Sequence, residues 1–147
     1  MAPTPMAPTL MREGLVVVIA GKYRLVPMER VVQIRVHHGT TRIPGAPPWV
    51  RGFANFEGRP VEVFDAARRL GCGELRLNDR SCEIFFATGT ACVGMLVDAV
   101  QRIIAVEDRH SCLSEETGQA GVPVLHNDEG TIPAIDLDAF FGPEAIA

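Results

Sequence analysis

Short apolar runs separated by turn-forming residues repeat along almost the whole chain. Runs of this length that are rich in β-branched and aromatic residues, and that end at Gly, Pro, Asn or Asp, indicate β-strands. The first half of the sequence contains five of them, at 15–20, 23–26, 31–36, 52–56 and 59–64. The second half contains five more, at 82–88, 91–97, 100–106, 122–126 and 131–135. The pattern predicts an all-β protein with short helices, built as a small barrel or a sandwich.

The segment 41–71 holds the densest set of residues that control the backbone. The motif Gly-x-x-Asn-x-x-Gly at 52–58 separates two apolar runs and predicts a β-hairpin. Asp65 follows the second run and is expected to cap a short helix at 66–70. Gly71 is expected to end that helix, because glycine adopts the left-handed backbone of a helix C-terminus at little cost.

Further local signals lie in the second half of the chain. The sequence Asn-Asp-Glu-Gly at 127–130 predicts a second hairpin, and the polar stretch 73–80 is expected to link two lobes. Asp98 and Asp136 each follow an apolar strand, as Asp65 does. All three are expected to accept hydrogen bonds from backbone N–H groups. These aspartates are therefore predicted to serve the fold and not a reaction.

Composition narrows the class of protein. A chain of 147 residues favours one domain or two small, closely packed lobes, and 47% hydrophobic residues can build a core. The net charge of −4 and the scattered Lys and Arg residues argue against binding to nucleic acid. No apolar run approaches the ~20 residues that span a bilayer, and the first 13 residues are Pro-rich without a signal-peptide pattern. We expect a disordered tail at 1–13 and a cytoplasmic protein without membrane insertion.

The residues that could carry chemistry form no recognisable site in the sequence. The four cysteines contain no Cys-x-x-Cys pair and are expected to be structural thiols: Cys72, Cys82, Cys92 and Cys112. The adjacent His37 and His38 would point to opposite faces of a strand. We therefore expect a solvated turn at these two histidines instead of a metal site.

Two wider combinations of residues remain as hypotheses. His110 and Cys112, completed by Cys72 or His126, could bind a metal, but zinc sites usually show tighter spacing. Ser111 or Cys112, with His126 and Asp136, could form a nucleophile, a base and an orienting acid, but no local catalytic signature accompanies them. We predict no enzymatic activity, no catalytic residue, no metal and no cofactor.

Three stretches in order resemble the CheW-like domain, the coupling module of bacterial chemosensory arrays. The first combines the strand 31–36 with Ile-Pro-x-x-Pro at 43–47, the hairpin 52–58 and the strand and helix at 61–70. The second is the run CVGMLVDAVQRIIAV at 92–106, and the third is GTIPAIDLDAFF at 130–141. The resemblance covers residues 15–141, and its specificity comes from the three stretches together.

The resemblance implies a finer fold than the strand pattern does. It implies two intertwined five-stranded SH3-like barrels that pack on a shared core, within a single domain at 14–142. We expect the first barrel at about 14–72 and the second at about 81–142, with exchange of a closing strand left open.

The resemblance also implies a function. CheW-like proteins are non-catalytic adaptors that bind the regulatory domain of a CheA-type histidine kinase and the cytoplasmic tip of a chemoreceptor. We expect the same partners here, at membrane-associated receptor arrays. Two alternatives stay open, namely an accessory scaffold that binds the kinase but not the receptor, and a small metal- or thiol-dependent protein.

Four positions are expected to contact partners, because they match the positions with which the family binds its receptors. They are Val31 and Gln33 on the strand 31–36, and Gly52 and Glu57 in the hairpin. Two of them depart from the family pattern, which usually has Arg at the position of Glu57 and Glu at that of Gln33. Since a glutamate repels the carboxylates that an arginine would bind, this hairpin is expected to select a different partner charge.

Overall fold

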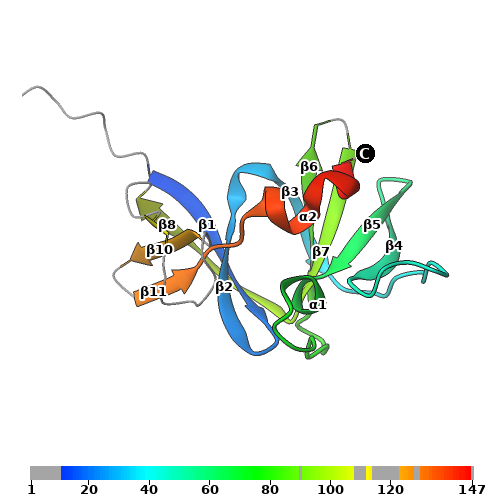
Figure 1. The fold of residues 1–147 in the computed structure, drawn as a ribbon, viewed down its shortest axis with the longest axis horizontal. Helices are drawn as coiled ribbons and strands as arrows, with labels where there is room; N and C mark the ends of the chain where they lie inside the picture. Colours follow the sequence, from blue (N-terminus) through cyan, green and yellow to red (C-terminus); the bar gives the residue numbers. More distant parts are fainter. Residues whose placement is uncertain (1–10, 90, 108–111, 114–122, 128–129, 147) are drawn as a thin grey trace, which may run out of the picture.

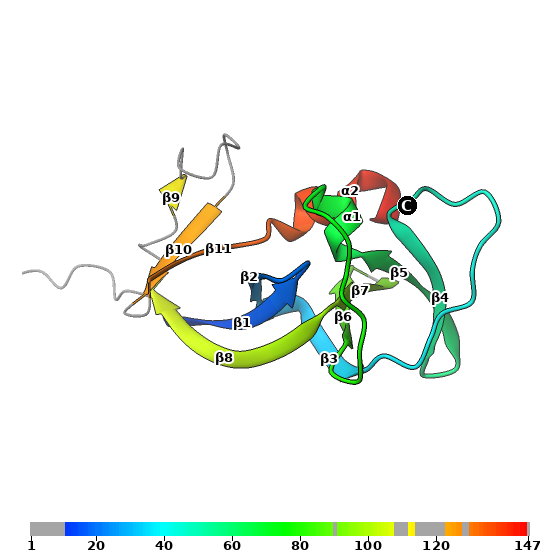
Figure 2. The same ribbon diagram turned by 90° about the horizontal axis from the view of Figure 1, so that it is seen from below.

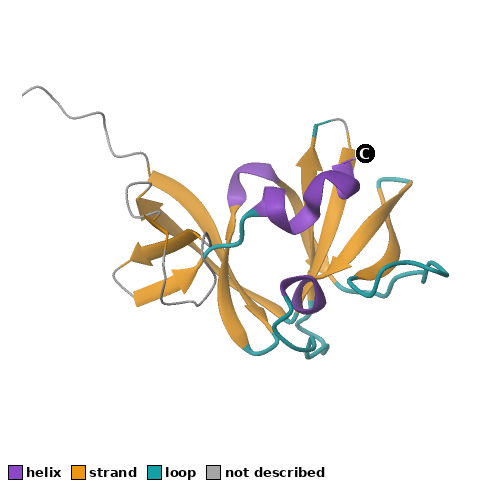
Figure 3. Ribbon diagram, viewed as in Figure 1, coloured by secondary structure: helices purple, strands orange, loops and turns teal. Residues whose placement is uncertain are grey.

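The computed structural model describes residues 11–89, 91–107, 112–113, 123–127 and 130–146. These residues form mostly strands, with short helical elements between them (Figure 3). The strands are β1 (Met11–Ile19), β2 (Lys22–Pro27), β3 (Val31–Val36), β4 (Val50–Phe56), β5 (Arg59–Asp65), β6 (Cys82–Thr88), β7 (Ala91–Val97), β8 (Ala99–Glu107), β9 (Cys112–Leu113), β10 (Pro123–Asn127) and β11 (Gly130–Pro133). The helical elements are η1 (Met28–Arg30), α1 (Ala66–Leu70) and α2 (Leu137–Ile146).

The all-β prediction is confirmed, because each of the ten predicted strands overlaps an observed one. Both predicted hairpins are present, as the antiparallel pairs β4–β5 and β10–β11. β1 begins at Met11, inside the stretch expected to be a disordered tail. Residues 1–10 of that expected tail lie outside the described residues.

The strands are arranged as two lobes, which lie side by side in Figure 1. One lobe is a five-stranded sheet in the order β3-β6-β7-β5-β4, in which β5 and β7 are parallel. The other lobe combines a sheet in the order β2-β1-β8 with a sheet in the order β11-β10-β9. A parallel bridge between Leu25 and Ala134 joins these two sheets. We call the first lobe the β3–β7 lobe and the second the β1–β8 lobe.

The observed pairing shows an exchange of strands between the two halves of the chain, which the expected barrels at 14–72 and 81–142 had left open. β1 and β2 pair with β8 from the second half of the chain, whereas β6 and β7 join β3, β4 and β5 from the first half. The register of β1 with β8 runs from Met11 opposite Glu107 to Val18 opposite Ala99. Local apolar patterns report where strands lie but not which distant strand they pair with, so the extent of this exchange could not be foreseen.

An apolar core lies between the two lobes and includes α2. Phe141 of α2 meets Phe64 and Phe86 edge-on, with ring centroids 5.3 Å apart in both pairs. The same cluster holds Leu15 of β1 and Met95 of β7, both fully buried. Figure 2 shows α1 and α2 on the same side of the molecule. The shared core that the resemblance implied is therefore present, and the last helix contributes aromatic rings to it.

The three aspartates act as backbone acceptors, as predicted. Asp65 accepts a hydrogen bond from the Arg68 N–H at 3.0 Å and caps α1, and Gly71 ends that helix at φ 67°. Buried Asp98 accepts from the N–H groups of Gly21 at 2.9 Å and Arg76 at 2.7 Å. It thereby attaches the β1–β2 turn and the stretch after α1 to the same point. Exposed Asp136 accepts from the N–H groups of Asp138 and Ala139, at the start of α2.

Candidate partner-binding site

Val31 and Gln33 lie on β3, an edge strand of the β3–β7 lobe. Val31 is half-buried and packs against the core between the lobes, while Gln33 is exposed. The ladder to β6 is irregular between these two residues, so that Val31 faces Phe86 and Gln33 faces Phe85. The irregularity leaves Val32 52% exposed. This edge strand therefore presents apolar surface beside a polar side chain, as a protein-binding strand can.

Gly52 lies on β4, where another backbone passes very close. A Cβ atom at this position would lie 2.1 Å from the carbonyl oxygen of Thr41, and the φ angle is +141°. Thr41 and Phe53 also exchange two backbone hydrogen bonds, at 2.9 and 2.8 Å. Gly52 is therefore required so that the segment between β3 and β4 can lie on the edge of β4.

Glu57 lies at the tip of the β4–β5 hairpin, with its side chain exposed. Its φ angle is +52°, a left-handed turn conformation, and the next N–H, of Gly58, donates to Asn55 Oδ1 at 3.0 Å. The predicted Gly-x-x-Asn-x-x-Gly turn is thus formed with the asparagine as its acceptor. Burial raises the pKa of the nearby Cys92 thiol, and the charge of Glu57 raises that pKa further.

Gln33 and the hairpin of Glu57 belong to the two opposite edges of the sheet, because β3 and β4 are its edge strands. The curvature of the sheet nevertheless brings the hairpin tip toward the face that carries Gln33. Gln33 faces Phe85 across the β3–β6 ladder, so both side chains lie on the same face. Phe85 stacks on Phe56, the residue before Glu57, with ring centroids 4.7 Å apart. The hairpin tip therefore folds back toward the face of the sheet that carries Gln33. Val31, which faces Phe86, lies on the opposite face, toward the other lobe.

Alkylation of Cys92 tests the position of Glu57. Because the thiolate is the reactive form, replacing Glu57 by Gln should lower the pKa of this thiol and increase its reactivity. We expect iodoacetamide at pH 8 and low salt to modify Cys92 about twofold faster in Glu57→Gln, and the difference to disappear at ~1 M salt. Mass spectrometry measures the rate, with Cys72 of the same sample as the internal control. Equal rates in both proteins would contradict the predicted charge effect.

The remaining candidates for chemistry are the adjacent His37 and His38 and the residues considered together with His110. His37 is not in a solvated turn as expected, because its Nδ1 lies 2.9 Å from Oε2 of Glu83 and its side chain is 15% exposed. His38 is exposed. Among the described residues no group of three His, Cys, Asp or Glu side chains could hold a metal ion. His110 lies outside the described residues, as do the side chains of Cys112 and His126.

The described cysteines are free and half-buried: Cys72, Cys82 and Cys92. Burial raises the pKa of the Cys82 thiol, as it does for Cys92. These two thiols are therefore poor nucleophiles, consistent with a structural role. The helices of the described chain are all too short or too polar to cross a membrane.

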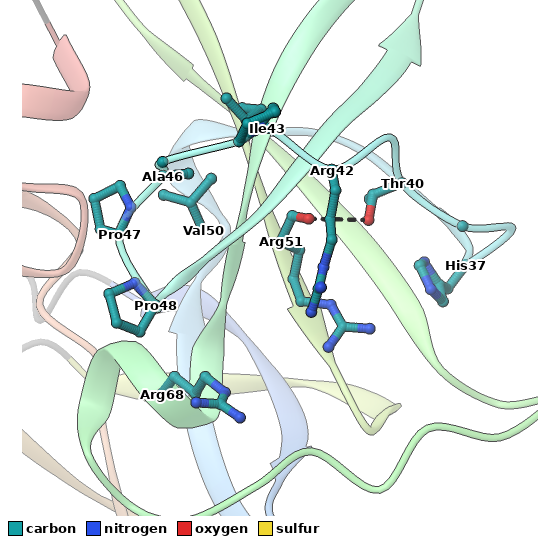
Figure 4. A pocket seen from close by; sticks show the side chains of 13 residues that line it. His37, Thr40, Arg42, Ile43, Ala46, Pro47, Pro48, Val50, Arg51 and Arg68 are labelled. Atoms are coloured by element: carbon teal, nitrogen blue, oxygen red, sulfur yellow. Dashed lines mark hydrogen bonds between the residues drawn. The ribbon is translucent and has the colours of Figure 1, made fainter.

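The sequence did not reveal a pocket of 750 Å³ beneath the segment between β3 and β4 (Figure 4). We call it the arginine pocket, because three arginines from separate elements line it: Arg42, Arg51 and Arg68. The other lining residues are His37, Gly39, Thr40, Ile43, Pro44, Gly45, Ala46, Pro47, Pro48 and Val50. Because the arginines lie on a loop, a strand and a helix, no local motif could have indicated their convergence.

Comparison with known proteins gives one consistent family. Residues 13–111 match the family described as CheW-like domain. The chemotaxis protein CheW of Bacillus subtilis is 29% identical over 136 residues, which cover 89% of this chain and 87% of the relative. The probable chemotaxis protein CheW of Rhizobium etli is 30% identical over 116 residues, covering 76% and 75% of the two chains.

A solved structure confirms the fold. The scaffolding protein TtCheW from Thermoanaerobacter tengcongensis superposes with a TM-score of 0.81. The match covers 92% of this chain and 96% of that chain at 21% sequence identity. The predicted pair of intertwined SH3-like barrels is thereby confirmed as the architecture. The modest identity shows that the fold is kept while most side chains differ.

Proposed function

Because this chain belongs to the CheW-like domain family, we propose that it is a non-catalytic adaptor that couples chemoreceptors to a CheA-type histidine kinase. The observation that carries the proposal is the agreement of sequence and fold over most of the chain. The family match spans 13–111, and the fold agrees with a scaffolding protein over 92% of the chain. The setting we propose is the cytoplasmic side of a receptor array.

We place the receptor contact at the four positions predicted from the family: Val31, Gln33, Gly52 and Glu57. Exposed apolar side chains accompany them, because Val32, Val36 and Phe53 are 52%, 48% and 39% exposed. Such a surface can bury apolar area against a partner helix or strand. The exposed carboxylate of Glu57 favours a receptor tip with a basic group at the matching position.

A second candidate rests on the departures at Glu57 and Gln33. If the receptor contact has been lost with the usual Arg and Glu, the protein is an accessory scaffold that binds the kinase alone. The kinase interaction does not depend on Glu57 in this alternative. Measuring both interactions separates the two candidates.

The test is the binding of the purified full chain to two proteins from the same genome, the kinase regulatory domain and the cytoplasmic tip of a chemoreceptor. Calorimetry should detect both interactions for the parent protein. We expect Glu57→Arg to weaken receptor binding about tenfold and to leave kinase binding unchanged, because it places a like charge against the basic partner group. The matched control is Asp79→Arg, which reverses an exposed charge in the stretch after α1.

The outcomes differ for each candidate. Binding to the kinase alone supports the accessory scaffold and contradicts receptor coupling. Binding to neither protein overturns the adaptor proposal. Equal losses in Glu57→Arg and Asp79→Arg would show a general charge effect, so that the hairpin would not be the contact.

A further inference from the structure

We propose that the arginine pocket is a docking site for an acidic segment of a partner protein, distinct from the receptor contact at β3 and the β4–β5 hairpin. The inference goes beyond the adaptor role and does not depend on which partner Glu57 selects. It rests on three converging guanidinium groups above an apolar, proline-built wall. Figure 4 shows these groups around one opening, with Pro47 and Pro48 along its side.

The guanidinium groups keep hydrogen-bonding capacity for a ligand. Arg42 is exposed, and no hydrogen bond or ion pair joins it to another of the described residues. Arg51 lies 3.8 Å from Asp65 Oδ2, and the Nε of Arg68 lies 4.0 Å from the same oxygen. Both separations are too long for good hydrogen bonds. Since each guanidinium carries five N–H donors, most of these donors remain available.

The balance of charge in the pocket is positive. No carboxylate is among the lining residues, although the whole chain has a net charge of −4. Asp65 is 3% exposed, and its Oδ1 already accepts the backbone N–H that starts α1. Glu74 reaches Arg68 only at 3.8 Å, with 86% of its side chain exposed. Arginine is the side chain best suited to carboxylates, because its planar donors match two carboxylate oxygens.

The wall of the pocket is rigid and apolar. Pro44, Pro47 and Pro48 line it together with Ile43 and Val50. The segment closes on itself through hydrogen bonds from the Ala46 N–H to Ile43 O and from the Val50 N–H to Pro47 O. Because the prolines and these turns hold the segment before binding, little conformational freedom is lost when a ligand enters.

The volume of the pocket, and the combination of charged and apolar side chains in its walls, favour a peptide over a small ion. A volume of 750 Å³ lies within the range of about 300–1,000 Å³ for sites that enclose multi-atom ligands. A segment that places an aspartate or glutamate on the arginines can lay a neighbouring apolar side chain on the prolines. The acidic chain as a whole argues against a nucleic acid as the occupant.

His37 lines the pocket and also contacts a buried side chain of the β3–β7 lobe. Its Nδ1 lies 2.9 Å from Oε2 of the buried Glu83 carboxylate. This contact holds the ring in one orientation at the pocket wall. The Thr40 hydroxyl lines the same wall and donates to Arg51 O at 3.4 Å.

The test is an NMR titration of the ¹⁵N-labelled full chain with an acetylated, amidated peptide of alternating leucine and glutamate. The control probes are the same peptide with lysine for glutamate, and inorganic phosphate. We expect shift changes at the amides of 39–51 and around Arg68, which weaken when sodium chloride rises from about 50 to 500 mM. In Arg42→Glu the affinity should fall about tenfold, the loss expected for one charge-assisted hydrogen bond.

Lys22→Glu is the matched control variant, because Lys22 is exposed on β2 in the other lobe. Its affinity for the acidic peptide should equal that of the parent. The proposal is overturned if the acidic peptide shifts no pocket amide, if Arg42→Glu and Lys22→Glu lose affinity equally, or if the lysine peptide binds as well. Phosphate that perturbs the pocket without any response to the acidic peptide would also overturn it, and would assign the pocket to small anions.

Discussion

Gly52→Ala is expected to destabilise the protein by at least about 4 kcal/mol, which is enough to unfold much of a typical small domain. The added Cβ would lie 2.1 Å from Thr41 O and 2.7 Å from the carbonyl carbon of the same residue, and both contacts are with backbone atoms. Neither can move without breaking the hydrogen bonds between Thr41 and Phe53. The φ of +141° adds strain for any side chain. Urea unfolding followed by circular dichroism measures the loss.

Gly58→Ala is the matched control for this prediction. Gly58 also has a positive φ, of +79°, but a Cβ there meets no atom within 4 Å. It should therefore lose only about 1 kcal/mol, the cost of the backbone conformation. If both variants unfold at the same urea concentration, the close approach of Thr41 to Gly52 is not what requires glycine. Because an unfolded Gly52 variant also loses binding, loss of partner binding by itself cannot assign Gly52 to the contact.

Arg35→Met is expected to cost about 3 kcal/mol, because it leaves the carboxylate of Glu83 buried without its guanidinium partner. Glu83 is 1% exposed and accepts from Nε and Nη2 of Arg35 at 3.2 and 3.1 Å. Arg35 is itself 30% exposed, which reduces the cost below that of a fully buried pair. Methionine keeps an apolar stem over Phe85, where the guanidinium now lies 4.7 Å from the ring centroid. Thermal unfolding with a urea titration measures the difference.

A double-mutant cycle isolates this ion pair from packing. Removing both charges in Arg35→Met with Glu83→Met should restore most of the stability, since no unpaired buried charge remains. Additive losses in the two single variants and the double variant would show that the pair is not coupled. The contact of His37 with Glu83 is lost in both proteins that carry Glu83→Met, so that this loss cancels in the coupling energy of the cycle.

The local structure around the hairpin and α1 could be predicted because each signal acts within a few residues. The Asn55 side chain closes the turn on Gly58, and Asp65 accepts from the N–H three residues later. Both contacts depend on residue type and short spacing, which a single sequence displays. The two hairpins and the short helix were therefore predicted correctly, with ends that differ by a few residues.

Only part of the candidate site could be predicted from the sequence in this way. The close approach required at Gly52 was one of the two roles expected for that glycine. Gln33 lies on the strand predicted at 31–36, and the position of that strand at the edge of its sheet was visible only in the structure. The proximity of Glu57 to Cys92 and the stacking of Phe56 on Phe85 follow from the curvature of the sheet. The assignment of these four residues to receptor binding stays a prediction that rests on the family pattern.

The all-β class, the hairpins, the aspartate caps and the resemblance to the CheW-like domain can all be predicted from local sequence patterns. The pairing of β1 and β2 with β8, the burial of Glu83 between Arg35 and His37, and the arginines that line one pocket from three elements were visible in the folded chain alone. The difference lies in the range of the interactions. Turns and caps are stabilised by neighbours along the chain, whereas strand exchange and charge clusters depend on which surfaces meet when the lobes pack.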